Sequence, residues 1–350
     1  MSESPTFDPP NPASAHARLD PLFPVSLARL RDIYSQANFK FEFHRLSFSD
    51  VLSGSPDEDA PGAVEQDLTE LSTATPRPTA DLLQRHFYWS AACFYRSFYL
   101  MLAYFSLERK PMPSWAHVTA YYSRFYAIKA LLNLFCANIV TLESKAKGDK
   151  KRTEVLIYLT MDGVKAMSAK KAKALWKTWG SHQVWWALFK QMQYVSDFPD
   201  KDGSHFALSD AYFNHASRNT INYSERYLEG FSELEWFDNS EVQMFSHMDI
   251  WRPRPDRDIT NIDSFFADTN PEDADEGDFY GDDAQIVWHG VRVYLELLSL
   301  LKVRQSFVTR EKLFGLLDRF GEQEYPILCG GIREAVTEYL PTWPEPGEPT

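Results

Sequence analysis

Residues 117–142 form the stretch that most constrains what this chain can fold into. Apolar side chains recur in it at three- and four-residue steps, which places them on one face of a helix: Val118, Tyr121, Phe125, Ile128, Leu132 and Phe135. A second stripe beside them mixes aromatic rings with polar groups, namely Tyr122, Tyr126, Lys129 and Asn133. Ser114 can cap the start of the helix. The pattern predicts a buried helix that begins near residue 114 and continues to residue 142.

A second long apolar run, residues 81–107, precedes this helix. Within it, residues 87–107 are nearly all apolar or aromatic but carry Arg96 at the centre, and a central arginine costs about 2.5–3.5 kcal/mol in a membrane. We therefore predict a buried helix, with Asp81 as its cap, and no membrane span. Two long helices joined by a short proline-bounded turn are expected to pack antiparallel as a helical hairpin.

The rest of the chain predicts a mainly α fold, a helical bundle with a small β-hairpin insertion and long acidic or proline-rich loops. Further helices are expected at residues 26–36, 284–303, 309–320 and 331–340, the third with Thr309 as its cap, and a strand is expected at residues 39–48. The predicted organisation has three parts. These are an N-terminal arm and irregular extension at 1–80, a helical core at 81–240 with an insertion at 143–207, and an acidic loop with C-terminal helices at 241–350.

Composition narrows the class of protein. At 350 residues, with 44% hydrophobic and 15% aromatic side chains, the chain can bury a substantial core. Its net charge of -13 excludes a general nucleic-acid coat, so nucleic-acid contact would require a local basic patch. The three cysteines form no CxxC or Cys/His cluster, and the N-terminus lacks the pattern of a signal peptide. We expect a cytoplasmic protein that holds no metal and no other cofactor.

One basic patch lies in residues 143–177, where ten basic and four acidic side chains give a net charge of +6. Residues 153–167 predict a β-hairpin in this segment, with Asp162–Gly163 as its two-residue turn. The basic residues allow two interpretations. They form a solvated surface, or they contact phosphate groups next to tryptophans that stack on bases. The second interpretation assigns binding roles to Lys150, Lys151 and Arg152.

The common catalytic motifs GxGxxG, GxxxxGK[ST], GxSxG and HExxH are absent. Two groups of polar residues remain as candidates. The first is the polar side of the central helix, with His117, Tyr122, Arg124, Tyr126 and Lys129; the alternative is that these side chains pack along a surface with their polar ends in water. The second is the segment Arg-Asn-Thr-Ile-Asn-Tyr at residues 218–223; the alternative is a capped turn in which Arg218 pairs with a carboxylate.

Together these two segments resemble a known family. AYYSRFYAIKALLNL, residues 120–134, resembles the AYYAxFYAAKALL helix of HEPN-superfamily proteins, which also follows a first long helix. RNTINY is similar to the R-x-x-A-D-Y segment that follows the third helix in stand-alone members. The resemblance covers about residues 81–142 and 208–240. It implies a helical bundle, usually dimeric, found in toxin–antitoxin and antiviral systems.

Active members of the family are metal-independent endoribonucleases with an arginine followed, four to six residues later, by a histidine. The histidine moves protons and the arginine offsets the charge that develops on the phosphate. The resemblance assigns the cationic role to Arg218 and a polar supporting role to Asn219 or Asn222. Tyr223 stands at the position of the histidine, and a phenol with an unperturbed pKa of about 10 is a poor base at neutral pH.

Two functions follow from these observations. The first is a HEPN-like bacterial defence or toxin protein that binds RNA and cuts it, with Arg218, Asn222 and Tyr223 as catalytic residues. Its binding residues are Tyr122, Arg124, Tyr126, Lys129 and the three basic residues at 150–152. The second is a non-catalytic interaction subunit that docks a partner protein. The expected partners are RNA, a second copy or another protein, and no membrane.

Overall fold

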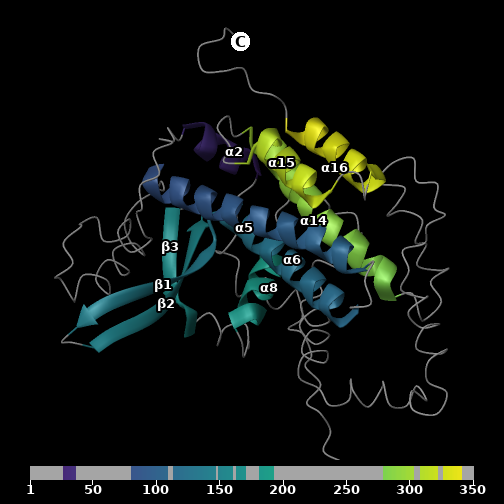
Figure 1. Ribbon diagram of the computed structural model, residues 1–350. Coiled ribbons are helices and arrows are strands. Elements are labelled where there is room, and N and C mark those ends of the chain that lie inside the picture. The colour runs from purple at the N-terminus through teal and green to yellow at the C-terminus, as the bar shows by residue number, and fades with distance from the viewer. Residues whose placement is uncertain are drawn as a thin grey trace, which may run out of the picture. The chain divides into compact units, whose positions relative to one another are not determined.

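A computed structural model of the chain describes residues 27–36, 80–108, 113–146, 149–160, 163–170, 181–192, 279–302, 308–321 and 326–340 (Figure 1). These residues are mainly helical and include one small antiparallel sheet, so the predicted fold class is confirmed. The helices are α2 (Leu27–Gln36), α5 (Ala80–Glu108), α6 (Pro113–Leu134), α8 (Ser181–Met192), α14 (Phe279–Leu301), α15 (Arg310–Phe320) and α16 (Pro326–Tyr339). The strands are β1 (Asn138–Ala146), β2 (Asp149–Thr160) and β3 (Gly163–Ser168).

The two long helices begin slightly earlier than predicted. Because α5 starts at Ala80 and α6 at Pro113, the predicted caps Asp81 and Ser114 lie one residue inside their helices. Proline suits the first position of a helix, because the N–H that it lacks would have no partner inside the helix. None of the helices in the described part of the chain is long and apolar enough to cross a membrane.

The predicted end of the central helix is wrong. α6 stops at Leu134, eight residues before the predicted end, because Cys136 takes a left-handed conformation with φ 54°. The N–H of Cys136 donates to the carbonyl of Asn133 (3.0 Å), and the N–H of Ala137 donates to that of Leu132 (2.8 Å). These two bonds form a Schellman motif, which satisfies carbonyls left open at a helix end. The β-branched residues that follow belong to β1.

The three strands form a sheet in the order β1-β2-β3. The predicted hairpin of β2 and β3 is confirmed, but Gly163, predicted as part of the turn, is the first residue of β3 and pairs with Thr160. Strand β1 was not predicted, because residues 138–142 were expected to continue the central helix. Residues 155–159 of β2 are buried in succession, so the second half of this strand is covered on both faces.

Two compact units share the long helices. Unit 1 contains α2, α5 up to Ala92, α6 from Lys129, the sheet and α8. In unit 1 the hydroxyl of Tyr34 on α2 donates to the carbonyl of Leu134 at the end of α6 (2.7 Å), and its ring lies 6.0 Å from that of Phe87 on α5. The end of α6 is therefore held by a side chain from α2.

Unit 2 contains α5 from Cys93, α6 up to Ile128, α14 up to Ser299, α15 and α16. The ring of Phe94 on α5 stacks on that of Tyr294 on α14, with centroids 4.2 Å apart. Tyr95, also on α5, accepts from the backbone N–H of Thr309 (3.4 Å). Burial is the main reason that the pKa of Tyr95 is raised to about 12; the hydrogen bond from Thr309 opposes the shift.

The C-terminal helices α15 and α16 lie side by side in unit 2 (Figure 1). The hydroxyl of Thr309 accepts from the N–H of Lys312 (3.4 Å), which confirms Thr309 as the predicted cap of α15. Arg310 donates to the carbonyls of Leu340 and Thr337, which lie at the end of α16. Arg333 on α16 forms an ion pair with Asp318 on α15.

Several predicted segments lie outside the described residues. They are most of the N-terminal arm and irregular extension, including the strand at 39–48, and residues 193–278. α14 begins at Phe279, within the end of the predicted acidic loop, and α16 begins five residues before the predicted start of the last helix. The boundaries of the three predicted parts stay predictions.

Candidate nucleic-acid interface

Charge is strongly segregated along the chain. Residues 82–142, which contain nearly all of α5 and α6, have a single acidic residue, Glu108, among the 49 of the protein. They have six basic residues: Arg85, Arg96, Arg109, Lys110, Arg124 and Lys129. With the +6 of residues 143–177, the segment 82–177 carries a net charge of +11, so the other residues carry -24. The positive charge is therefore concentrated in the two long helices, the sheet and the residues just after it.

In unit 2, α5 and α6 are joined by two reciprocal hydrogen bonds between Ser97 and Ser123. The hydroxyl of Ser97 donates to the carbonyl of Ser123 (2.8 Å), and the hydroxyl of Ser123 donates to the carbonyl of Ser97 (2.9 Å). Both side chains are fully buried, so the small serines let the two backbones approach closely. Since Arg96 contacts Tyr126, the residue number rises along α5 as it falls along α6, and the predicted antiparallel hairpin is confirmed here.

Arg96 of α5 and Tyr126 of α6 form a polar contact in this hairpin. An η nitrogen of Arg96 donates to the hydroxyl of Tyr126 (2.9 Å), and the guanidinium carbon lies 4.8 Å from the centre of the tyrosine ring. Arg96 is exposed and Tyr126 is half-buried. The tyrosine thus holds an exposed guanidinium by both a hydrogen bond and a cation–π contact.

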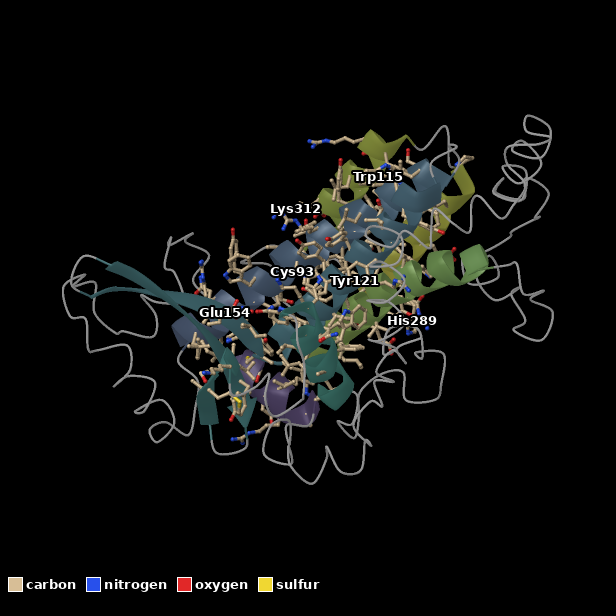
Figure 2. All side chains as sticks on the ribbon, turned by 90° about the horizontal axis from the view of Figure 1, so that it is seen from below. Cys93, Trp115, Tyr121, Glu154, His289 and Lys312 are labelled. Atoms are coloured by element: carbon tan, nitrogen blue, oxygen red, sulfur yellow. The ribbon has the colours of Figure 1, made fainter. Side chains whose placement is uncertain are left out.

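Further aromatic side chains lie on the same side. On α6, residues 115, 119, 122 and 126 follow helical spacing and are all exposed or half-buried. Trp115 is 65% exposed, and Tyr99, one turn beyond Arg96 on α5, is 62% exposed. Figure 2 labels Trp115 and, for contrast, the fully buried Tyr121 of the same helix. We define the arginine–tyrosine face as Arg96, Tyr99, Trp115, Tyr122 and Tyr126.

The predicted binding residues of the central helix lie in different environments in the structure. Tyr122 and Tyr126 are half-buried and belong to the arginine–tyrosine face, whereas Arg124 is only 4% exposed. The ammonium group of Lys129, which belongs to unit 1, lies 4.8 Å from the ring centre of Trp185 on α8. The side chain of His117 is outside the described part of the chain.

The three basic residues predicted to contact phosphate, Lys150, Lys151 and Arg152, occupy consecutive positions of β2. The register places Lys145 opposite Lys150 and Glu143 opposite Arg152. Figure 1 shows that this end of the β1–β2 pair extends away from the helices of unit 1.

The predicted catalytic residues Arg218, Asn222 and Tyr223 lie outside the residues that the structure describes. Their catalytic role stays a prediction. Among the described residues, no group of three or more His, Cys, Asp or Glu side chains could hold a metal ion.

Unit 1 contains a buried polar group between α5 and α6. His86 is fully buried; burial lowers its pKa to about 4, and a hydrogen bond with Asn133 acts in the opposite direction. Asn133 also donates to the carbonyl of Lys129 (2.7 Å), and Ser90 donates to the carbonyl of Ala130 (2.7 Å). A neutral imidazole here contributes to the packing of the two helices. The pairing of Ser90 with Ala130 shows that α5 and α6 are antiparallel in this unit as well.

Three members of the arginine–tyrosine face were not singled out from the sequence as binding residues. Arg96 and Tyr99 lie in a run that is apolar overall and predicts a buried helix, and Trp115 lies beside the start of the second such run. The spacing of 115, 119, 122 and 126 was the available signal, together with the absence of acidic residues from both helices. Comparison of the chain with protein-family models, with curated proteins and with solved structures finds no match.

Proposed function

We propose that the protein binds RNA and that it is a HEPN-like helical protein of a bacterial defence or toxin system. The observation that carries the proposal is the charge segregation, in which residues 82–177 have a net charge of +11 within a chain of -13. A polyanion is attracted to such a segment and repelled by the rest of the chain, which orients it on binding. The antiparallel pairing of α5 and α6 supports the resemblance, because these helices carry its first motif.

Fluorescence anisotropy with a labelled single-stranded RNA at low salt tests the binding. We expect saturable binding that is competed by unlabelled RNA. An unlabelled acidic polypeptide of similar charge serves as the control for simple charge attraction and should compete poorly. Wild-type protein that leaves the anisotropy of the RNA unchanged at low salt would contradict the proposal.

Metal-independent cleavage is the catalytic part of the proposal, and Arg218 is the residue that tests it. Wild-type protein incubated with RNA in EDTA is expected to yield fragments that end in a 2′,3′-cyclic phosphate, because the ribose 2′-hydroxyl is the attacking group. Arg218→Ala should abolish these fragments, whereas Arg218→Lys should retain part of the activity. Intact RNA with a protein that still binds it would leave RNA binding without cleavage as the function.

A non-catalytic role in docking a protein partner is the second candidate. It is favoured by the exposure of Trp115 and Tyr99, since tryptophan, tyrosine and arginine are enriched at the energetic centres of protein interfaces. The solution mass of the protein purified from its native cells, together with the proteins that accompany it, tests this role. A single species at the mass of one chain would count against it and against the dimer that the resemblance implies.

A further inference from the structure

We propose that the arginine–tyrosine face is a stacking platform for the unpaired bases of a single-stranded RNA, so that the ligand is single-stranded and not a duplex. The inference rests on the proposed RNA binding and specifies which form of RNA is bound. Every member of the face lies in unit 2, on α5 or α6.

The guanidinium of Arg96 is already placed for stacking. Its central carbon lies 4.8 Å from the centre of the Tyr126 ring, and the hydrogen bond to the Tyr126 hydroxyl holds the group in place. Because Arg96 is exposed, its outer face is open to a planar group. Bases of single-stranded RNA stack on aromatic rings and on guanidinium planes in this way.

The tyrosines of α6 are supported from behind by buried rings. Tyr122 makes an edge contact with Tyr121, with centroids 5.3 Å apart, and Tyr126 makes one with Phe125 at 5.8 Å. Tyr121 and Phe125 are buried and stack on each other with nearly parallel planes, 7° apart. Outer rings held in this manner lose little conformational freedom when a base stacks on them, which favours binding.

Charge complementarity favours RNA as the occupant. The described side chains of unit 2 on α5 and α6, residues 93–107 and 115–128, include no carboxylate and contain Arg96 as the exposed cation. A basic protein segment would find no acidic partner on this face. A duplex would offer phosphates but no open base faces, because its bases are already stacked. A single strand offers both the negative charge and the planar groups.

The test compares three labelled probes by fluorescence anisotropy: a single-stranded oligoadenylate, an abasic strand of equal length, and an RNA duplex. We expect wild-type protein to prefer the oligoadenylate. Tyr99→Ala and Tyr126→Ala should each weaken binding of the oligoadenylate about tenfold and leave binding of the abasic strand unchanged, since one stacked base contributes about 1–3 kcal/mol.

Arg96→Lys is the most specific variant, because it keeps the charge and removes the planar group. It should weaken oligoadenylate binding as the tyrosine variants do. The matched control is Trp89→Ala, which removes an exposed tryptophan of α5 that lies in unit 1 and outside this face. It should bind as wild type. Thermal unfolding followed by circular dichroism confirms that each variant is folded; the exposed Tyr99 is the safest position in this respect.

The outcomes separate the two proposals. Wild-type protein that binds none of the probes overturns the proposed function. Equal binding of oligoadenylate, abasic strand and duplex, unaffected by the variants, retains RNA binding and overturns the stacking platform. Variants that keep full RNA affinity but change the mass of the protein in solution would assign the face to a protein interface and likewise overturn it.

Discussion

The burial of His86 predicts how the stability of the folded protein depends on pH. Its pKa is about 4 in the folded protein, whereas an unfolded chain gives about 6.5. Below pH 6.5 the unfolded state therefore binds more protons than the folded state, and stability falls as the pH decreases toward 4. The loss between about pH 7.5 and about pH 5 is expected to be about 2 kcal/mol from this group alone. His86→Gln and His86→Phe should each reduce the acid dependence of the urea midpoint; an unchanged dependence in both variants would contradict a neutral buried histidine.

The burial of the three cysteines predicts that their thiols react slowly in the folded protein. Cys93, Cys136 and Cys329 are all buried, and burial raises the pKa of Cys136 to about 12, although a hydrogen bond with Tyr34 opposes the shift. Because the thiolate is the reactive form, native protein should not react rapidly with a disulfide reagent at mildly alkaline pH. Denatured protein should show three reactive thiols. Rapid titration of one thiol before denaturation would mean that a buried cysteine is accessible.

At the scale of single residues, the sequence predicts which apolar side chains are buried better than it predicts which polar side chains lie together. Val118, Tyr121, Phe125, Ile128, Leu132 and Phe135 were predicted to face the core, and all are buried. Arg124 was grouped with Tyr122 and Tyr126 because it is polar and close in sequence, yet two residues on a helix span about 200°. Polarity alone did not show on which side the arginine lies.

The helices α15 and α16 offer a test at the scale of the element. Gly315 and Gly330 lie inside these helices, and a methyl group added at either position would meet no atom within 4 Å. Glycine in a helix is less favourable than alanine by about 1 kcal/mol, chiefly because the unfolded chain is more flexible. Gly315→Ala and Gly330→Ala should each raise stability by up to about 1 kcal/mol, measured by thermal unfolding. Gly321→Ala is the contrasting control and should lower stability, because Gly321 caps α15 with a φ of 105°.

The wrong end of the central helix and the missing prediction of β1 have the same cause. The helix predicted to extend to residue 142 ends at Leu134, and β1 takes the residues from Asn138 onward. Both conformations bury the apolar residues of this stretch, so periodicity could not separate them. The end of the helix depends on a left-handed cysteine and on pairing with β2, which is a tertiary contact. In contrast, the α5–α6 hairpin and the β2–β3 hairpin follow from local pattern and short connections.

At the scale of the whole molecule, the central feature is the contrast between a positive segment and an acidic remainder. The sequence alone predicted the patch at 143–177, and the structure adds that the acid-poor helices before it form an aromatic face with an exposed arginine. RNA binding is therefore the claim on which the other functional proposals depend.

The salt dependence of RNA binding tests this claim most directly. We predict that the logarithm of the binding constant falls linearly with the logarithm of the salt concentration, with a slope of about -0.7 for each phosphate neutralised on a single strand. If Lys150, Lys151 and Arg152 each contact a phosphate, then changing all three to glutamine should make the slope less steep by about 2. Absence of binding by wild-type protein at low salt, or the same slope with and without these three cations, would contradict the account.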